Sequence, residues 1–215
     1  VIVSHPASKL RELTANAQHE FIAISSYFVP GEDGMQWLRE MKDRGINVSI
    51  LTNSLASIDV IAAFAGYRRY REALVVAGIN LYEMKPLSRN RTKPGRFASS
   101  SRASLHSKVY IIDRAHVIIG TMNLDPRSVQ LNTEIALIIH SQQLAQQLIE
   151  MFERTVAPGG MSYHIVQAGS PEDVHLEWRA EENGQDMRYI SDPGAGFWRT
   201  IKAGIYSAIP FEEQL

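Results

Sequence analysis

Cysteine is missing from this sequence of 215 residues, and the formal net charge at pH 7 is only -1. The lack of thiols excludes disulfides, thiolate metal sites and a cysteine nucleophile, and it fits any redox compartment. The small net charge gives no general preference for a polyanionic partner, although charge can still be concentrated locally. No apolar run reaches the roughly 18 residues that a bilayer-spanning helix needs. What remains is a globular protein whose 45% hydrophobic residues can form a sizeable core.

The sequence signatures of several enzyme classes are also absent. There is no H-E-x-x-H, no G-x-S-x-G and no glycine-rich P-loop, so zinc proteases, serine hydrolases of that type and nucleotide-driven enzymes lack their usual motifs. The seven histidines are scattered and form no pattern of metal ligands. We therefore expect no metal and no other cofactor.

The spacing of apolar residues predicts strands and helices in alternation over residues 21–84. The expected strands are 21–29, 46–54 and 79–84. The two helices between them are expected to end at Gly45 and Gly78, and Asp59 is expected to cap the second one. Alternation with short connections predicts an α/β fold, with a mixed, largely parallel sheet flanked by helices.

A basic segment, residues 85–102, interrupts this pattern. It contains Lys85, Arg89, Arg91, Lys93, Arg96 and Arg102, and no acidic residue lies between Met84 and Ile112. A long loop of this kind is either a solvated insertion or a rim that attracts phosphate, and its role stays open.

The C-terminal part of the chain is expected to form a hairpin and a helix. Asn183-Gly184 is typical of a two-residue hairpin turn. Five apolar residues after it have helical spacing, with Arg199 and Lys202 at the flank: Phe197, Trp198, Ile201, Ile205 and Tyr206. Such a helix could lie on lipid or pack on its own domain. We therefore divide the chain into a main domain, residues 1–160, and a C-terminal extension with the hairpin and the amphipathic helix, residues 161–215.

The segment LHSKVYIID, residues 105–113, carries the most informative pattern. Alternation along a strand puts His106 and Lys108 on the same face. A turn at Asp113 leads into a second strand, which ends near Thr121 and Asn123, and a third strand is expected over residues 132–139.

On that third strand, Asn132 and Glu134 would share one face. If the three strands are neighbours, His106, Lys108, Asn123 and Glu134 converge at one end of the sheet, where α/β folds tend to place ligand sites.

These side chains together suit a phosphoryl group. A lysine ammonium and an asparagine amide donate hydrogen bonds to non-bridging phosphate oxygens, whose charge must be stabilised during reaction. A histidine can attack phosphorus or carry a proton near neutral pH. A glutamate on the far ring nitrogen would orient the imidazole and stabilise its cation. The H-x-K pair alone is common by chance, and a lone strand histidine is more often a core residue.

The longer pattern is more specific. The H-x-K-x(4)-D run from His106 to Asp113, followed by GTMN, DPRS and LNTE, resembles the signature of the phospholipase D superfamily. Almost the whole chain resembles the C-terminal catalytic half of bacterial cardiolipin synthases. The stretches that carry this likeness are SSYFVPGEDG (25–34), ILTNSLASIDV (50–60), GYRRYREALVVAGINLYEMKP (66–86), NLDPRS (123–128) and DPGAGFWRTIKAGIYSAIPFEEQL (192–215).

The resemblance implies a phospholipase D-like fold and transfer of a phosphatidyl group between alcohols. One motif histidine would form a covalent phosphohistidine, and the other would protonate the leaving alcohol. The roles that it implies here are His106 as acid and base, Lys108 and Asn123 as phosphate ligands, Thr121 as a minor hydroxyl contact, Glu134 as the partner of the histidine, Asp113 as a mostly structural motif residue, and Arg127 and Ser128 as substrate contacts.

The family's active site needs two copies of the motif, and this sequence has one. None of the other six histidines is followed two positions later by lysine. Since the chain begins at Val1 without Met, we expect the second copy in an N-terminal segment of a longer protein, or else in the partner of a homodimer. The resemblance thus implies that residues 1–160 form a phospholipase D-like catalytic half-domain, and that this chain alone holds half of an active site.

The expected partners are a phospholipid substrate and a second motif-bearing half, with peripheral contact to the cytoplasmic side of the inner membrane. Two alternatives remain open. One is a phospholipase D or phosphodiesterase, including an endonuclease whose basic segment would hold a nucleic-acid backbone. The other is a catalytically incomplete half that binds anionic lipid or a partner chain. The donor lipid, and whether water or an alcohol is the acceptor, depend on pocket walls and stay open too.

Overall fold

The computed structural model describes residues 5–86, 104–170 and 173–207, which contain six helices and nine strands. The helices are α1 (Pro6–Ala15), α2 (Gly31–Asp43), α3 (Ile61–Val76), α4 (Pro126–Gln130), α5 (Gln142–Val156) and α6 (Phe197–Ser207). The strands are β1 (Glu20–Ser25), β2 (Asn47–Asn53), β3 (Asn80–Met84), β4 (Lys108–Ile112), β5 (His116–Gly120), β6 (Ala136–His140), β7 (Ser162–Ala168), β8 (His175–Glu182) and β9 (Gln185–Tyr189).

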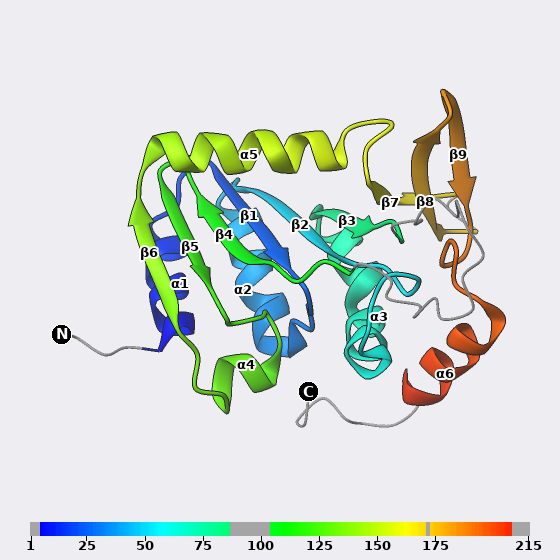
Figure 1. Ribbon diagram of the computed structural model, residues 1–215, viewed down its shortest axis with the longest axis horizontal. Coiled ribbons are helices and arrows are strands. Elements are labelled where there is room, and N and C mark those ends of the chain that lie inside the picture. The colour runs from blue at the N-terminus through cyan, green and yellow to red at the C-terminus, as the bar shows by residue number, and fades with distance from the viewer. Residues whose placement is uncertain (1–4, 87–103, 171–172, 208–215) are drawn as a thin grey trace, which may run out of the picture.

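The nine strands form one mixed sheet in the order β6-β5-β4-β1-β2-β3-β7-β8-β9 (Figure 1). The mixed α/β architecture expected from the sequence is therefore confirmed. Between the named strands, only β1 with β2 and β2 with β3 pair in parallel, and the other six pairings are antiparallel, so the expectation that the sheet is largely parallel was wrong. Helices α2 and α3 are the crossover connections that link β1 to β2 and β2 to β3, whereas short turns such as those between β4 and β5 and between β8 and β9 join antiparallel neighbours.

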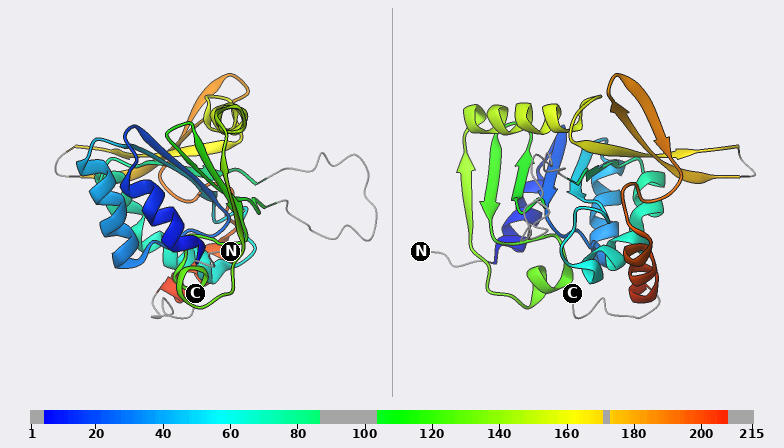
Figure 2. Two further views of the ribbon diagram at one scale, coloured as in Figure 1. Left: turned by 90° about the vertical axis from the view of Figure 1, so that its left-hand side faces the viewer. Right: turned by 45° about the vertical axis from the view of Figure 1, so that its right-hand side comes forward.

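Helices cover both faces of the sheet and create two apolar cores. On one face Phe21 and Ala23 of β1 pack with residues of α2 and α3, such as Leu38 and Phe64. On the other face the alternate β1 residues Ile22 and Ile24 belong to a core that α5 completes. Figure 2 shows α1 and α2 on one side of the sheet and α5 on the other. Burial on both faces explains why all six residues of β1 are buried.

Helix α3 begins one residue later than the sequence suggests, so Asp59 does not cap it. Val60 occupies the N-cap position and makes no side-chain cap hydrogen bond. The Asp59 carboxylate accepts hydrogen bonds from the Val60 N–H (3.0 Å) and the Tyr27 hydroxyl (2.9 Å) instead. It thereby joins the connection after β2 to the connection after β1.

The strand expected over residues 132–139 begins at Ala136, so Asn132 and Glu134 lie in the connection between α4 and β6. Their side chains bond to each other, with Asn132 Nδ2 donating to Glu134 Oε1 (3.2 Å). The expected neighbourhood of the three strands is confirmed, because β5 pairs with both β4 and β6. The error concerned the start of the third strand and not its place in the sheet.

The C-terminal extension contains the expected hairpin and helix. Strands β8 and β9 pair across Asn183 and Gly184, both of which have positive φ (53° and 76°), as a type I′ turn requires. Strand β7 pairs with β3 and so continues the sheet of the N-terminal part. The boundary at residue 160 falls in the connection between α5 and β7 and remains a prediction.

Residues 85 and 86 are the only part of the basic segment that the structure describes, and the rest of it lies outside the described residues. Lys85 Nζ donates to the carbonyl of Gly160 (3.2 Å). Among the helices in the described ranges, none is both long and apolar enough to cross a membrane.

Candidate active site

The candidate site lies at the edge of the sheet where β1 and β2 end and β4 begins, at the lower edge in Figure 1. Asn53, the last residue of β2, organises this edge. Its side chain accepts from the Leu105 N–H (3.0 Å) and donates to the Leu105 carbonyl (2.9 Å) and the Ser26 carbonyl (3.0 Å). One buried amide therefore fixes both the end of β1 and the residue that precedes His106.

His106 and Lys108 differ in their surroundings although they lie two residues apart. His106 belongs to the extended connection before β4, its side chain is exposed, and its ring makes no hydrogen bond to any described residue. Lys108 is the first residue of β4 and is only 8% exposed. Its ammonium donates to Ser26 Oγ (3.0 Å) and to the His106 carbonyl (3.1 Å). The histidine ring is thus open to a ligand, and the lysine is held beneath it.

No carboxylate forms a salt bridge with Lys108 among the described residues. Desolvation lowers the pKa of Lys108, while the more distant charges of Glu134, Asp59 and Asp125 oppose that shift. A buried ammonium whose hydrogen-bond partners are neutral oxygens gains stability when an anion approaches. This electrostatic arrangement favours a phosphoryl ligand.

Asn123 reaches the same place from the end of β5, which pairs with β4 on the side away from β1. The N–H of Tyr27 donates to Asn123 Oδ1 (3.4 Å), so the Ser26-Tyr27 pair touches both Lys108 and Asn123. The side-chain NH₂ of Asn123, a residue 8% exposed, has no partner in the described part of the chain. The structure therefore brings His106, Lys108 and Asn123 together around the end of β1.

Thr121 and Glu134 form a second group beside this one. The Thr121 hydroxyl donates to Glu134 Oε2 and accepts from the Ile135 N–H (3.1 Å). No hydrogen bond or ion pair joins Glu134 to His106 among the described residues. Thr121 and Glu134 are thus occupied with each other, and the role of Glu134 as the histidine's partner stays a prediction.

Asp113 lies at the opposite end of β4, about 16 Å along the strand from its start. Its carboxylate accepts from the backbone N–H groups of Gln18 (2.8 Å), His19 (2.8 Å) and Glu20 (3.0 Å). Burial raises the pKa of Asp113, but these hydrogen bonds outweigh that effect, so the pKa is lowered. The motif aspartate anchors the connection between α1 and β1 and does not reach the other motif side chains.

The DPRS residues mainly build α4. Asp125 is the N-cap, and it accepts from the Ser128 N–H (2.8 Å) and the Ser128 hydroxyl (3.1 Å). Desolvation raises the pKa of Asp125. Ser128 is buried, so its hydroxyl serves the helix cap and does not face a ligand. Arg127 is exposed and donates to Asn132 Oδ1 (3.3 Å). Neither residue joins the group around His106.

Two participants, Ser26 and Asn53, carried no role in the sequence prediction. Both belong to stretches that support the family resemblance, SSYFVPGEDG and ILTNSLASIDV. Their local signal was weak, because serine and asparagine after a buried strand are typical turn residues. Their contacts to the region of His106 span 81 and 52 residues of sequence, so only the folded sheet reveals them.

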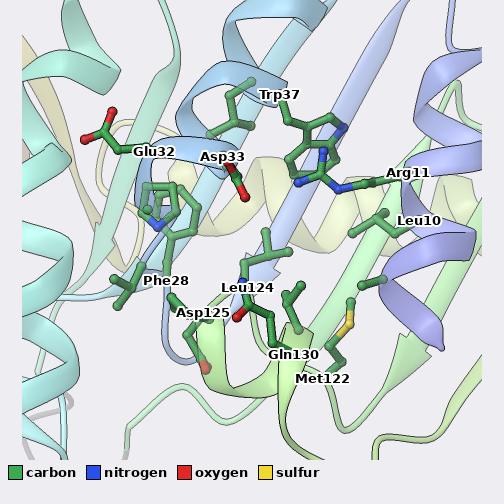
Figure 3. A pocket seen from close by; sticks show the side chains of 18 residues that line it. Leu10, Arg11, Phe28, Glu32, Asp33, Trp37, Met122, Leu124, Asp125 and Gln130 are labelled. Atoms are coloured by element: carbon green, nitrogen blue, oxygen red, sulfur yellow. The ribbon is translucent and has the colours of Figure 1, made fainter. Parts of the chain in front are cut away.

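A cavity of about 410 Å³ lies next to the site, between α1, α2 and α4 (Figure 3). Phe28 and Leu124 form part of its apolar wall, and Arg11 lies against the ring of Trp37, 5.6 Å from the ring centroid. His106 and Lys108 are not among its lining residues. The cavity shares only the chain around residues 122–126 with the candidate site. Within the described ranges, no three His, Asp or Glu side chains form a cluster that could hold a metal.

Comparison with known proteins agrees with this geometry. Residues 10–156 match the family described as "Cardiolipin synthase, PLD-like domain". The chain is 34% identical over 206 residues to cardiolipin synthase C of Escherichia coli (strain K12), covering 95% of this chain and 42% of that protein. It is 39% identical over 188 residues to an uncharacterized protein of Helicobacter pylori (strain J99), covering 87% of this chain and 36% of that protein. The chain thus spans less than half the length of these curated relatives.

Solved structures show the same fold. Nuc from Salmonella typhimurium, a phospholipase D family member, superposes with a TM-score of 0.50 at 21% identity, covering 68% of this chain and 83% of that one. NucT from Helicobacter pylori gives 0.52 at 17% identity, covering 68% and 84%. The family match over residues 10–156, the structural likeness and the H-x-K-x(4)-D run together identify the chain as a member of the cardiolipin synthase, PLD-like domain family of the phospholipase D superfamily.

Proposed function

We propose that this chain supplies half of an active site that transfers a phosphatidyl group between alcohols, as a cardiolipin synthase-like enzyme. The observation that carries the proposal is Lys108. Its buried ammonium donates to two neutral oxygens, forms no salt bridge within the described residues, and lies beneath the exposed ring of His106. A phosphodiester would supply the missing negative charge and would place its phosphorus next to that ring.

The proposed chemistry has two steps. In the first, a histidine of a second motif attacks phosphorus, a P–N bond forms, the P–O bond to the leaving alcohol breaks, and His106 gives its proton to the leaving oxygen. In the second, His106 takes a proton from the incoming alcohol, whose oxygen forms the new P–O bond as the P–N bond breaks. Lys108 and Asn123 would bind the non-bridging oxygens throughout. Asn53 would hold the segment that carries His106.

The second histidine must come from outside this chain. We propose either an N-terminal half of a longer protein or the partner in a homodimer. The length of the curated relatives supports the first source, because this chain covers 42% and 36% of the two proteins described above. Peripheral attachment to the cytoplasmic side of the inner membrane, with phospholipid as substrate, belongs to the same proposal.

His106→Gln in the intact protein tests the role of the histidine. His19→Gln is the matched control, because His19 is equally exposed but lies at the opposite end of the sheet, next to Asp113. Vesicles of phosphatidylglycerol and phosphatidylethanolamine would be supplied, and the lipid products would be followed by mass spectrometry. Loss of a positioned acid or base costs about 10² to 10⁴ in rate. The transfer rate of His106→Gln should therefore be lower than that of the parent by this factor, and the rate of His19→Gln should equal that of the parent.

Parent-like turnover by His106→Gln would refute the assigned role. The same protein should be assayed on DNA. If the parent cleaves DNA and turns over no lipid, the function is that of a phosphodiesterase with the same motif and not phosphatidyl transfer.

A further inference from the structure

Helix α6 packs on the protein with its small face and exposes its large one. Ala203 is the only fully buried residue of the helix. At 100° per residue, Phe197, Ile201, Ile205 and Trp198 lie within about 100° of one another, and the centre of that stripe is directly opposite Ala203. Phe197 is 73% exposed and Trp198 is 72% exposed. An amphipathic helix that only completed a core would have the reverse orientation.

Polar contacts hold α6 in this orientation. Arg199 donates through Nε to the carbonyl of Leu55 (2.9 Å) and through its NH2 group to the carbonyl of Ile58. At the other end of the helix, Arg69 of α3 donates to the carbonyl of Ser207 (3.1 and 2.6 Å). Figure 1 and the right panel of Figure 2 both show α6 beside α3. The apolar stripe is therefore presented outward by a fixed scaffold.

The charges around the stripe are mostly positive. Residues 193–207 contain Arg199 and Lys202 and no acidic residue. On α3, against which α6 packs, Arg68 and Arg69 are exposed, and Glu72 is the single acidic residue of that helix. Exposed aromatic rings with flanking cations suit the boundary between the headgroups and the acyl chains of an anionic bilayer.

We propose that the outward face of α6, formed by Phe197, Trp198, Ile201 and Ile205 with Lys202 at its flank, docks onto the surface of an anionic phospholipid bilayer. The helix lies in the interface and does not cross it. The same Arg199 contacts connect α6 to the segment that follows β2. The last residue of β2, Asn53, bonds to Leu105, the residue before His106. Docking through α6 therefore brings the site-bearing edge to the lipid. Docking of this kind rests on the proposed function and deepens it, and its evidence is the exposed apolar face of α6 with the cations of α6 and α3 beside it.

Binding to vesicles tests the proposal without turnover. The intact protein and its Phe197→Ser/Trp198→Ser variant would be mixed with vesicles of phosphatidylglycerol and phosphatidylcholine in equal amounts, and separated by flotation. Loss of two aromatic anchors should weaken the partition coefficient by at least about tenfold, given the apolar area removed. Lys202→Gln should weaken it by about fivefold and should reduce its salt dependence. Met151→Ser is the matched control, since Met151 is exposed on α5, on the other face of the sheet.

Tryptophan fluorescence gives a second reading. Trp178 is buried and Trp37 is partly buried, so Trp198 is the exposed one of the three tryptophans. Its emission should shift to the blue when anionic vesicles are added, and the shift should vanish in Trp198→Phe.

Unchanged flotation of the double variant, or no change in Trp198 emission, would overturn the proposal. A third outcome would also overturn it: the parent does not bind vesicles but self-associates, and the double variant does not self-associate. The face would then join two copies of the chain. His106→Gln should bind vesicles like the parent. Failure of the proposed function would therefore appear in turnover and not in flotation.

Discussion

Arg71→Met should be among the most destabilising single substitutions in this chain. Arg71 is 3% exposed, and its guanidinium lies 3.1 Å from Glu83 Oε1 and 2.8 Å from Asp192 Oδ1. The rings of Phe64 and Trp178 are within 5 Å of it, at 4.9 and 4.8 Å. This cluster joins α3 and β3 to the C-terminal extension, because Asp192 and Trp178 both belong to the extension.

The magnitude follows from what the substitution leaves behind. Glu83 is fully buried; its Oε2 accepts a hydrogen bond from Trp178 Nε1 (2.9 Å), and its Oε1 faces Arg71 as an ion pair. Removing one member of a buried ion pair strands the other charge and costs about 3–5 kcal/mol. Methionine fills a similar volume, so a cavity adds little. We expect a loss of about 4 kcal/mol, a large part of the roughly 5–15 kcal/mol that stabilises a typical domain.

Urea denaturation followed by circular dichroism measures this loss. Lys9→Met is the matched control, because the Lys9–Glu12 pair (2.7 Å) lies on the surface and contributes about 0.5 kcal/mol or less. Arg71→Met/Glu83→Leu should recover part of the stability, since replacing a buried pair by apolar residues is far less costly than breaking it. An Arg71→Met variant within about 0.5 kcal/mol of the parent, or additive effects in the double variant, would refute the reasoning.

Two further predictions concern the ends of β2 and β4. Asn53→Ala should lower kcat for lipid transfer by about 10² with little change in KM. The reason is that the substitution removes the hydrogen bonds that hold Leu105, next to His106, while the proposed phosphate ligands remain. A change in KM as large as the change in kcat would argue against a positioning role. Asp113→Asn should cost about 1–2 kcal/mol at neutral pH, from weakened charge-assisted hydrogen bonds to three backbone N–H groups. Since the folded-state pKa of Asp113 is lowered, this stability is present above the unfolded pKa of about 3.8 and is lost as pH falls through the folded value. Urea midpoints of parent and variant should therefore converge as the pH falls from 3.8 through the lower folded-state pKa, and a constant difference would contradict the assignment.

Much of the fold could be predicted from local patterns. Strands were expected within residues 21–29, 46–54 and 79–84, and all three are present. The mostly apolar start of the first segment fits the burial of all six residues of β1, whereas burial alternates along β3. The hairpin turn at Asn183-Gly184 could also be predicted, because a turn with positive φ at both positions favours that dipeptide. The antiparallel pairing of β1 with β4 and of β3 with β7 could not be predicted, since these contacts join segments far apart in sequence.

The candidate site was predicted only in part for the same reason. The spacing of His106 and Lys108 predicts a phosphate site, which stays a prediction, and the structure adds that the buried Lys108 ammonium donates to Ser26 Oγ. The predicted start of β6 at residue 132 was wrong, because β6 begins at Ala136. The side chains of Asn132 and Glu134 bond to each other in the connection before the strand, and such local hydrogen bonds compete with strand pairing.

The most direct test of the central claim is the rate of phosphatidyl transfer by Lys108→Met in the intact protein, with Lys9→Met beside it. Methionine matches the lysine stem in length and removes the buried charge, so the fold should persist with at least its original urea midpoint. The transfer rate of Lys108→Met should be lower than that of the parent by about 10² to 10³, which is the usual cost of losing one preorganised donor to a reacting oxygen. Lys9→Met should keep the parent rate. A Lys108→Met protein that transfers phosphatidyl groups at the parent rate would contradict the claim that this ammonium holds the phosphoryl group.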